Sequence, residues 1–431
     1  MFSTDVVIGQ DGALLTEKSK KMEFKWPEMG LTEIPDWIYT SPDIYQLEIE
    51  KIFHGDTWNF VALEAEIPKP GDFKRSFVGP TPVVVTRNVD GSLHVFENRC
   101  AHRGVEFCRQ NLGNTKEFIC PYHSWSYDLT GNLQGVPFKR GIKGEGGGMP
   151  RDFDNKNHGL RKLKVSVIHG VIFASFSVNI EDIRNYISSE ILEEFEVVFK
   201  GRELDIHGYY RNELPGNWKL YHENLKDPYH ATLLHSFLVT FGLMVAGSKN
   251  AMIADPLGRH GTLASAKPDN VASALDDNTK HEIRNFREDF KLSDERILDY
   301  IREFDSPWSV TMQTIWPNLI VQRELNTLGI RQIIPNGPHS QIMIWTMFGY
   351  KDDSEDMTRH RLRQANLMGP SGYLGVEDNE AIKFLQEGVR RSTSEVGVLK
   401  LDGSNTGSSN SVISESGIRG MYKYYRNLMG F

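Results

Sequence analysis

The sequence predicts a protein of the α+β class, with an all-β domain followed by a domain built on an antiparallel sheet flanked by helices. The chain has 431 residues, which exceeds the 100–200 residues typical of one domain. Short β-rich runs separated by turn residues fill much of the first half, and longer strand and helix patterns fill the second. Hydrophobic residues make up 39% of the chain, which is ample for large cores.

The N-terminal part divides into an arm, a helix and the all-β domain. Residues 1–45 are polar and mixed, and we expect an arm that exposes the basic run at 18–21. Apolar residues recur over 45–53 as in a helix. Strand runs then lie between Pro-Gly, Gly-Pro and Asp-Gly turns, which places the domain at 46–176. The predicted strands are 59–63, 77–78, 82–86, 93–96 and the region 165–176.

The second domain is predicted to span 177–431. Its expected strands are 316–321, 328–334 and 342–350, and its expected helices are 356–366 and 379–391. The polar run 252–283 is interpreted as a surface excursion over the site. The Ser/Asn/Gly-rich segment 403–416 is interpreted as a mobile tail or a lid.

Composition excludes several classes of function. The net charge of −8 argues against nucleic acid or an anionic membrane as partners. No apolar run approaches 18 residues, and no secretory signal pattern opens the chain. Three cysteines imply no disulfide framework, so we expect a reducing, cytoplasmic location. No Gly-x-Gly-x-x-Gly opens a helix, so the sequence shows no fingerprint of a nicotinamide- or flavin-binding domain.

Two Cys-His pairs lie inside the all-β domain, as Cys100-Ala101-His102 and Cys120-Pro121-Tyr122-His123. Zinc accepts two thiolates and two imidazoles. A Rieske [2Fe–2S] cluster uses the same set, with two cysteines on one iron and two histidines on the other. Zinc sites of this spacing usually carry a Cys-x-x-Cys half, which is missing here. The flanking residues also resemble those of a Rieske site, so the cluster is favoured. Cys108 lies outside the pattern and is predicted to be a core thiol.

A second cluster contains Asp227, His230 and His235. Two imidazoles and a carboxylate are the ligands of mononuclear non-haem Fe(II) oxygenases. His230 and His235 lie roughly 140° apart on an ideal helix, so they can share an ion only if the helix ends or bulges between them. The alternative is an amphipathic helix with two incidental histidines.

Together the two clusters resemble the large (α) subunit of Rieske non-haem iron aromatic-ring-hydroxylating oxygenases. The resemblance runs from about residue 44 to the end, and it is greatest to the terephthalate, salicylate and anthranilate type. The stretches that carry it are Phe96–Arg99, Asn217–Tyr221, Asp227–Ala231, Leu233–His235, Arg363–Pro370 and Ile418–Gly420.

The resemblance implies a third iron ligand in the acidic run 375–380, which we assign to Asp378 with Glu377 as the competitor. It also implies that Asp227 links the iron site to the Rieske histidine of a neighbouring subunit, as a carboxylate between two imidazoles can do. Asn224 is a further candidate, although some relatives place this asparagine four residues before the aspartate instead of three.

The resemblance further implies the reaction and its partners. The [2Fe–2S] cluster passes electrons to Fe(II), which uses O2 to hydroxylate an aromatic carboxylate. The expected partners are a β subunit, a ferredoxin and/or an NAD(P)H-dependent reductase, in an α3 or α3β3 oligomer. Two alternatives stay open, namely a terephthalate dioxygenase and a Rieske monooxygenase or N-demethylase of a non-carboxylate substrate. A zinc or electron-transfer module without oxygenase chemistry would have no use for the second cluster.

Arg331 is the predicted substrate anchor. It lies on an expected strand and shares a face with Gly329 and Ile333. A guanidinium pairs with both oxygens of a carboxylate, and a structural salt bridge is the alternative role. The resemblance implies that the terephthalate and salicylate types use a strand arginine at this place. It also implies that the terephthalate type needs a second arginine near the C-terminus, where this chain has Val412. One anchor favours a monocarboxylate such as a salicylate- or anthranilate-like benzoate.

Overall fold

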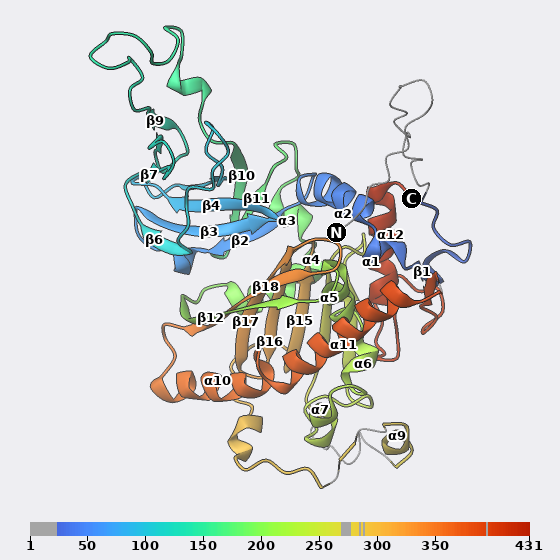
Figure 1. The fold of residues 1–431 in the computed structure, drawn as a ribbon. Helices are drawn as coiled ribbons and strands as arrows, with labels where there is room; N and C mark the ends of the chain where they lie inside the picture. Colours follow the sequence, from blue (N-terminus) through green and yellow to red (C-terminus); the bar gives the residue numbers. More distant parts are fainter. Residues whose placement is uncertain (1–23, 269–276, 284–285, 288, 394) are drawn as a thin grey trace, which may run out of the picture.

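The computed structural model describes residues 24–431 except 269–276, 284–285, 288 and 394, so the basic run at 18–21 lies outside the described residues. Two β-sheets dominate it (Figure 1), and they belong to the all-β and α+β parts that the sequence predicts. Among the described residues, no helix has both the length and the apolar character needed to cross a bilayer.

The first sheet has seven antiparallel strands in the order β2-β11-β10-β5-β4-β3-β6. A three-stranded sheet, β7-β8-β9, accompanies it. Cys120 lies in the loop between β7 and β8, whereas Cys100 lies in the loop between β5 and β6 of the larger sheet. The predicted strand runs all lie in this region, and the short run 77–78 is the end of a longer strand. The bounds are β2 Asn59–Leu63, β3 Asp72–Val78, β4 Thr81–Arg87, β5 Leu93–Glu97, β6 Leu112–Asn114, β7 Phe118–Ile119, β8 Ser126–Tyr127, β9 Leu133–Gly135, β10 Lys162–Ile168 and β11 Val171–Ser175.

The second sheet also has seven antiparallel strands, ordered β12-β18-β17-β16-β15-β14-β13. The strand predicted from residue 316 begins at Leu319, because Pro317 has no N–H for the ladder and lies in the turn before β16. The bounds are β12 Leu204–Leu214, β13 Asn250–Ala254, β14 Gly261–Ser265, β15 Val310–Ile315, β16 Leu319–Glu324, β17 Thr327–Pro335 and β18 Gln341–Tyr350.

The interpretation of 252–283 as a surface excursion is wrong for its first half. Residues 261–265 form β14, every residue of which is buried between β13 and β15. The strand consists of Gly, Thr, Leu, Ala and Ser, whose small and polar side chains look like a loop in sequence. These small and polar side chains are buried because β14 pairs with β13 on one side and β15 on the other. Part of the remaining stretch, 269–276, lies outside the described residues.

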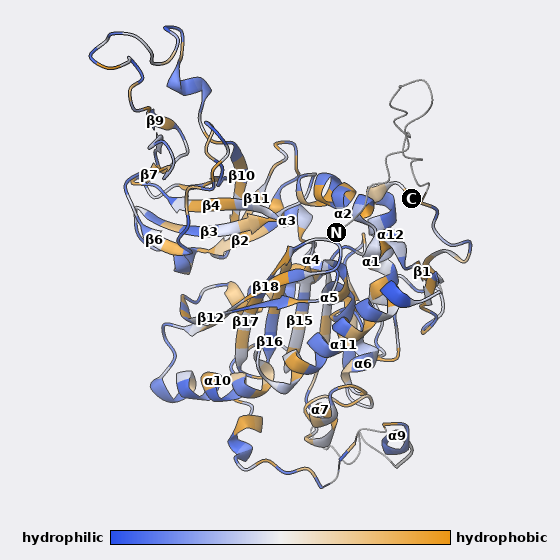
Figure 2. Cartoon of the chain, viewed as in Figure 1, coloured by the Kyte–Doolittle hydropathy of each residue, from blue (hydrophilic) through white to orange (hydrophobic). Residues whose placement is uncertain are grey.

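Helices cover both faces of the second sheet. α4 packs with Ile315, Val321 and Ile330 on one face, and α5, α10 and α11 gather over the other. α10 and α11 mix hydrophilic and hydrophobic residues along their length (Figure 2), as expected for helices with one buried side. The bounds are α3 Ile183–Tyr186, α4 Ser189–Phe199, α5 Trp218–Asn224, α6 Pro228–Ala231, α7 Ser236–Thr240, α9 Asp277–Glu282, α10 Glu355–Met368, α11 Tyr373–Arg391 and α12 Ser416–Met429.

The described part of residues 1–45 is not the exposed arm that the sequence predicts. β1 (Glu33–Pro35) pairs with β19 (Val396–Val398), and α1 (Trp37–Thr40) and α2 (Pro42–Glu48) follow. Ser41 caps α2, and a π-helical turn, Ile49–Phe53, continues it. Ile34, Ile38 and Phe53 lie in the core of the second domain. The sequence alone did not reveal that this segment is packed, because the residues that cover it lie far along the chain.

Two further segments affect the site. α11 begins at Tyr373 rather than at 379, so the acidic run lies within the helix and not in a turn before it. The segment 403–416 is fastened to the domain: Met252 and Ser409 exchange backbone hydrogen bonds, and the Arg419 guanidinium donates to the carbonyls of Leu399, Leu401 and Asn405. These contacts do not fit a free tail.

The two domains are joined by polar contacts at the second sheet. The Asn318 side chain accepts a hydrogen bond from the Phe60 N–H at 2.8 Å and donates to the Phe60 carbonyl at 3.0 Å. Gln332 donates to Ser76 Oγ and to the Phe77 carbonyl, each at 3.1 Å. Phe60, Ser76 and Phe77 lie in β2 and β3, Gln332 lies in β17 and Asn318 directly precedes β16, so these hydrogen bonds join strands of the two domains.

Candidate metal centres

The two Cys-His loops of the first domain share one backbone geometry. In each, the Cys N–H donates to the carbonyl five residues on and the N–H four residues on donates to the Cys carbonyl, at 2.8 and 2.9 Å in both loops. The fourth position has a positive φ in both, at Gly104 (75°) and Ser124 (56°). Identical turns therefore present Cys100 and Cys120 to each other.

The side chains of these loops are arranged by depth. Cys100 and Cys120 are buried, whereas His102 and His123 are exposed, with their Nδ1 atoms 3.1 Å apart. Burial and the neighbouring Cys100 thiol raise the pKa of Cys120, although backbone N–H groups oppose this. Two facing thiols inside and two facing imidazoles outside fit a cluster whose two irons take different ligands.

Neighbouring aromatic residues hold this arrangement. The His102 ring stacks on Trp125 with centroids 4.8 Å apart, and Tyr127 Oη lies 3.2 Å from Cys100 Sγ. Cys108 is buried apart from the loops, and burial raises the pKa of its thiol to about 11. Such an inert thiol is the core residue that the sequence predicts.

In the second domain the chain breaks its helix between the two histidines, as their spacing requires. Asp227 caps α6 by accepting the Tyr229 N–H at 2.8 Å, and His230 lies inside this four-residue helix. α6 ends at Ala231, and His235 is the residue before α7. The two short helices turn both rings toward one point, with centroids 5.3 Å apart.

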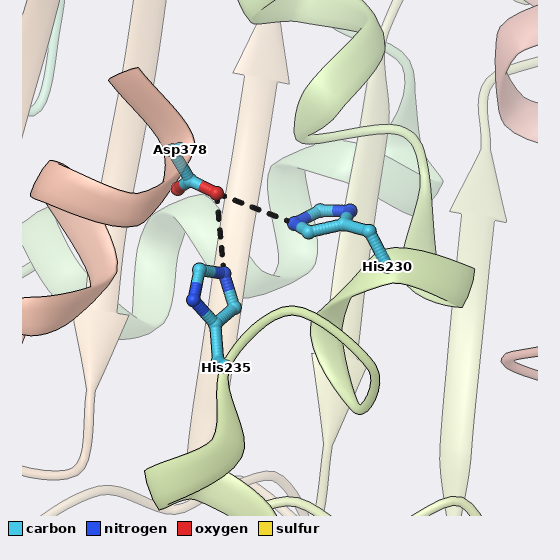
Figure 3. Close-up of side chains that lie close together, drawn as sticks. All are labelled: His230, His235 and Asp378. Atoms are coloured by element: carbon cyan, nitrogen blue, oxygen red, sulfur yellow. Dashed lines mark ion pairs between the residues drawn. The ribbon is translucent and has the colours of Figure 1, made fainter. Parts of the chain in front are cut away.

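Asp378 of α11 completes the group (Figure 3). Its Oδ1 lies 3.1 Å from His235 Nε2 and 3.5 Å from His230 Nε2. One ligand atom from each of the three residues lies within 4.8 Å of the others. This geometry favours Asp378 over Glu377 as the carboxylate of a two-histidine, one-carboxylate metal site.

Each histidine has a second carboxylate on its other side. Glu377 Oε2 lies 2.7 Å from His235 Nδ1, and Asp227 Oδ2 lies 3.5 Å from His230 Nδ1. Glu377 can hold a proton on His235 Nδ1 and leave the Nε2 lone pair of that ring free for a cation. Asp227 faces His230 Nδ1 without a hydrogen bond, since this nitrogen has no hydrogen-bond partner among the described residues. Glu377 is thus placed to orient a ligand rather than to be one. Two acidic residues one apart in the sequence could not be assigned these roles without the helix.

The charges of this group are mutually dependent. Burial lowers the pKa of His230, but the carboxylates of Asp227 and Asp378 outweigh it and raise that pKa to about 10. Burial likewise raises the pKa of Asp378, but His235 and His230 hold it well below its usual range. The carboxylate and the two imidazoles thus face one another across the place where a divalent cation would bind, and this donor set fits an iron ion.

Asn224 lies at the same point. Its Nδ2 donates to Asp378 Oδ1 at 3.1 Å and lies 3.3 Å from His230 Nε2, while its Oδ1 is buried without a partner among the described residues. The structure thus brings Asn224 and Asp227 to opposite sides of His230. Both are positioned to adjust that ring.

A cavity opens from the group between the helices and the second sheet. It includes His230, His235 and Asp378 at one side and Arg331 on the sheet. Its other walls are largely apolar, formed by Leu225, Ala231, Leu238, Met244, Leu263, Val310, Met312, Met368 and Leu374. One further polar residue, Glu324, lines it and has no counterpart in the sequence analysis.

Two families match the chain in succession. The "Rieske [2Fe-2S] domain" covers residues 57–144, and the "Ring hydroxylating alpha subunit (catalytic domain)" covers 201–430. The chain belongs to the ring-hydroxylating oxygenase α-subunit family. It is therefore an oxygenase that carries a Rieske [2Fe–2S] cluster and a mononuclear iron, and a zinc-binding or purely electron-carrying role is excluded.

The relatives agree in length as well as in sequence. Salicylate 5-hydroxylase, large oxygenase component, of Ralstonia sp is 44% identical over 94% of this chain and 96% of that protein. Anthranilate 1,2-dioxygenase large subunit of Burkholderia cepacia is also 44% identical, covering 94% and 95%. Terephthalate 1,2-dioxygenase, terminal oxygenase component subunit alpha 2, of Comamonas sp is 39% identical, covering 94% and 97%. They belong to the three types that the sequence motifs of this chain resemble.

The fold is shared more widely. The structure of naphthalene 1,2-dioxygenase with indole bound matches with a TM-score of 0.75 at 21% identity, over 93% of this chain and 92% of that one. The α+β prediction is confirmed by this match, together with the two family matches.

Proposed function

We propose that this oxygenase hydroxylates the ring of an aromatic monocarboxylate, of the salicylate or anthranilate kind, using O2 and electrons from a separate reductase. The observation that supports this most is the position of Arg331 in the wall of the cavity that also contains His230 and Asp378. An arginine there can hold a carboxylate while the ring lies against apolar walls.

Arg331 is held by neutral partners. Its Nη1 donates to Tyr221 Oη at 2.9 Å and its Nη2 to Gln322 Oε1 at 3.1 Å, and its guanidinium stacks 3.8 Å from the centroid of Trp345. Its Nε is buried without a hydrogen-bond partner within the described ranges, and none of the ion pairs there includes this residue. A charge buried in this way is costly until a carboxylate pairs with it. These contacts argue against a structural salt bridge.

The metals would be held as the motifs predict. Cys100, His102, Cys120 and His123 are the proposed ligands of the cluster, and His230, His235 and Asp378 are those of the iron. The iron supplies activation of O2 next to the ring. The chain holds the substrate, keeps water out with apolar walls and orients each imidazole through Glu377, Asp227 and Asn224. We also propose a division of the chain into domains at 46–176 and 177–431, with the described part of 1–45 packed against the second domain.

A single anchor favours one carboxylate. Val412, at the place proposed for a second anchor, is an apolar side chain buried in the core of this domain. Among the described residues that line the cavity, Arg331 is the one arginine or lysine, so a second carboxylate there would lose its hydration without gaining such a partner. This supports a monocarboxylate over terephthalate.

The proposed partners follow from the chemistry and from the names of the relatives. The names "large oxygenase component" and "terminal oxygenase component subunit alpha 2" describe parts of larger systems. We propose a β subunit, a ferredoxin and/or an NAD(P)H reductase, and an α3 or α3β3 assembly in the cytoplasm. The exposed His102 and His123 would be accessible to another subunit or an electron donor.

A product assay tests the proposal. The holoenzyme is supplied with a surrogate reductase, NADH and 18O2, and is given benzoate, salicylate, anthranilate, terephthalate and neutral aromatic compounds. We expect labelled products from monocarboxylates with the highest kcat/KM. Equal or better turnover of terephthalate, or a preference for substrates without a carboxylate, would refute the assignment. The number of labelled atoms also distinguishes mono- from dioxygenation.

A further inference from the structure

Three polar side chains form a continuous row on the cavity face of the second sheet. In the register of β16 and β17, Ile320 pairs with Arg331 and Gln322 with Gly329, so Arg331, Gln322 and Glu324 all point to the same face. Arg331 Nη2 donates to Gln322 Oε1 at 3.1 Å, and Gln322 Nε2 donates to Glu324 Oε2. The amide of Gln322 thus separates a cation at one end from a carboxyl group at the other.

Glu324 has no structural partner that accounts for its burial. The residue is 6% exposed, and none of the ion pairs among the described residues includes it. Its Oε2 accepts a hydrogen bond from Gln322 Nε2, which also donates to the Met368 carbonyl at 2.6 Å. Burial of a carboxyl group is costly unless hydrogen bonds compensate for the lost hydration. Because Glu324 lines the cavity, a ligand there can supply a further hydrogen bond to it.

The contrast with another buried glutamate supports a ligand role. Glu194 lies on the opposite face of the sheet and pairs with Arg323 Nη2 at 2.5 Å and with Ser306 Oγ at 2.9 Å. These contacts satisfy both of its oxygens without any ligand. Glu324 lacks such a cation and lines the cavity instead. Burial also raises its pKa to about 7, although Arg331 opposes this.

We propose that Glu324 is a specificity-determining residue that accepts a hydrogen bond from a hydroxyl or amino group on the substrate ring while Arg331 holds the carboxylate. This rests on the proposed function, because it takes an aromatic carboxylate as the substrate class. A carboxyl group offers acceptor oxygens in either protonation state. Together the two side chains select a ring that carries a carboxylate for Arg331 and a hydroxyl or amino group for Glu324. The apolar walls alone would not distinguish hydroxy- or aminobenzoate from benzoate.

The expected selectivity follows from leaving a buried acceptor unpaired. A site built to bind a donor rejects an analogue that lacks it, because the buried group then loses its partner. The effect for one hydrogen bond to a charged or ionisable group is about tenfold or more. Analogues that lack the donor, such as benzoate itself and the methoxybenzoates, should therefore bind poorly.

The first experiment uses the unmodified holoenzyme. Dissociation constants are measured by calorimetry for benzoate, the three hydroxybenzoates, their methoxy ethers and 2-aminobenzoate. At least one hydroxy- or aminobenzoate should bind about tenfold more tightly than benzoate and its ether. Equal binding of benzoate and all of its hydroxy and amino derivatives would overturn the proposal without any variant.

The second experiment uses Glu324→Gln, which keeps the shape and leaves an oxygen to accept the Gln322 hydrogen bond. The preference for the donor-bearing benzoate should fall about tenfold, while the Kd for benzoate changes little. Glu213→Gln is the matched control: Glu213 lies on β12 of the same sheet, is exposed and is absent from the cavity. The cluster absorption spectrum and the iron content check that each variant is folded. An unchanged preference in a folded Glu324→Gln protein would overturn the role.

A third variant separates this inference from the proposed function. Arg331→Met removes the carboxylate anchor, so all benzoates should bind more weakly if the substrate class is right. If Arg331→Met has no effect on any benzoate, the proposed substrate class fails. If it weakens all of them but Glu324→Gln leaves their ranking intact, the role of Glu324 alone fails.

Discussion

The two proposed metal centres use similar side chains in different structural settings. The Cys-His residues lie between residues 100 and 123, on two loops with identical backbone hydrogen bonds and with exposed histidines. The iron ligands extend from residue 230 to residue 378, and they meet under helices and beside a sheet. The first centre depends on local turns. The second depends on packing between elements far apart in sequence, and each of its histidines needs a carboxylate to orient it.

The largest expected effect is at the local centre. His123→Ala removes one of two imidazoles from a cluster that cannot replace it, so the visible Rieske spectrum should be lost completely. Absorption and electron paramagnetic resonance spectra measure this. Iron at the second centre should be retained if the two centres are independent. A normal cluster spectrum in this variant would contradict the assignment of all four ligands.

The next effect is at the distant centre. Asp378→Ala should lose the mononuclear iron and keep the cluster, because it removes the carboxylate that both Nε2 atoms face. Metal analysis against the absorbance of the cluster gives the ratio. Glu377→Gln should instead keep the iron with an affinity weakened by roughly 10–100-fold, since it orients His235 from Nδ1. Loss of iron from Glu377→Gln and not from Asp378→Ala would reverse the two roles.

A smaller effect is expected from the residue proposed to join the two centres. Asp227→Asn keeps the cap of α6, since an amide oxygen can accept the Tyr229 N–H, but removes the charge beside His230. Both metals should remain, and coupled turnover should fall roughly 100-fold, as for other residues that orient a metal ligand. Reduction of the iron after the cluster can be followed by stopped flow. Full turnover by this variant, or full activity of a proven monomer, would contradict a bridge between subunits.

The smallest of these effects concerns substrate affinity alone. Arg331→Leu should raise KM for a monocarboxylate roughly 10–100-fold, because a bidentate, charge-assisted contact is lost. Both metal contents should be unchanged. Arg331→Lys is the matched control, since it keeps the charge without the planar fork. Its KM should lie between those of the unmodified enzyme and Arg331→Leu. An unchanged KM in Arg331→Leu would remove the main support for a carboxylate substrate.

Local patterns in the sequence were enough for the family, both cofactors and the general fold. The Cys-His loops need a few consecutive residues whose turns are fixed by nearby hydrogen bonds, so their spacing and their flanking residues carry the information. The break between His230 and His235 was also predictable, because five residues on one helix cannot aim two rings at one ion. Strands such as β4 and β5 followed from short β-rich runs bounded by turn residues.

Tertiary structure decided whatever depends on distant partners. Glu377 and Asp378 are adjacent acidic residues, and their different roles arise because α11 starts at Tyr373 and turns Asp378 toward the two histidines. Glu324 looks like any strand residue until β16 and β17 pair and place it in the cavity with Arg331. The same reason explains the errors at 252–265 and 24–45, whose covering partners lie far along the chain. Sequence patterns record local geometry, whereas burial and charge environment exist only after these segments meet.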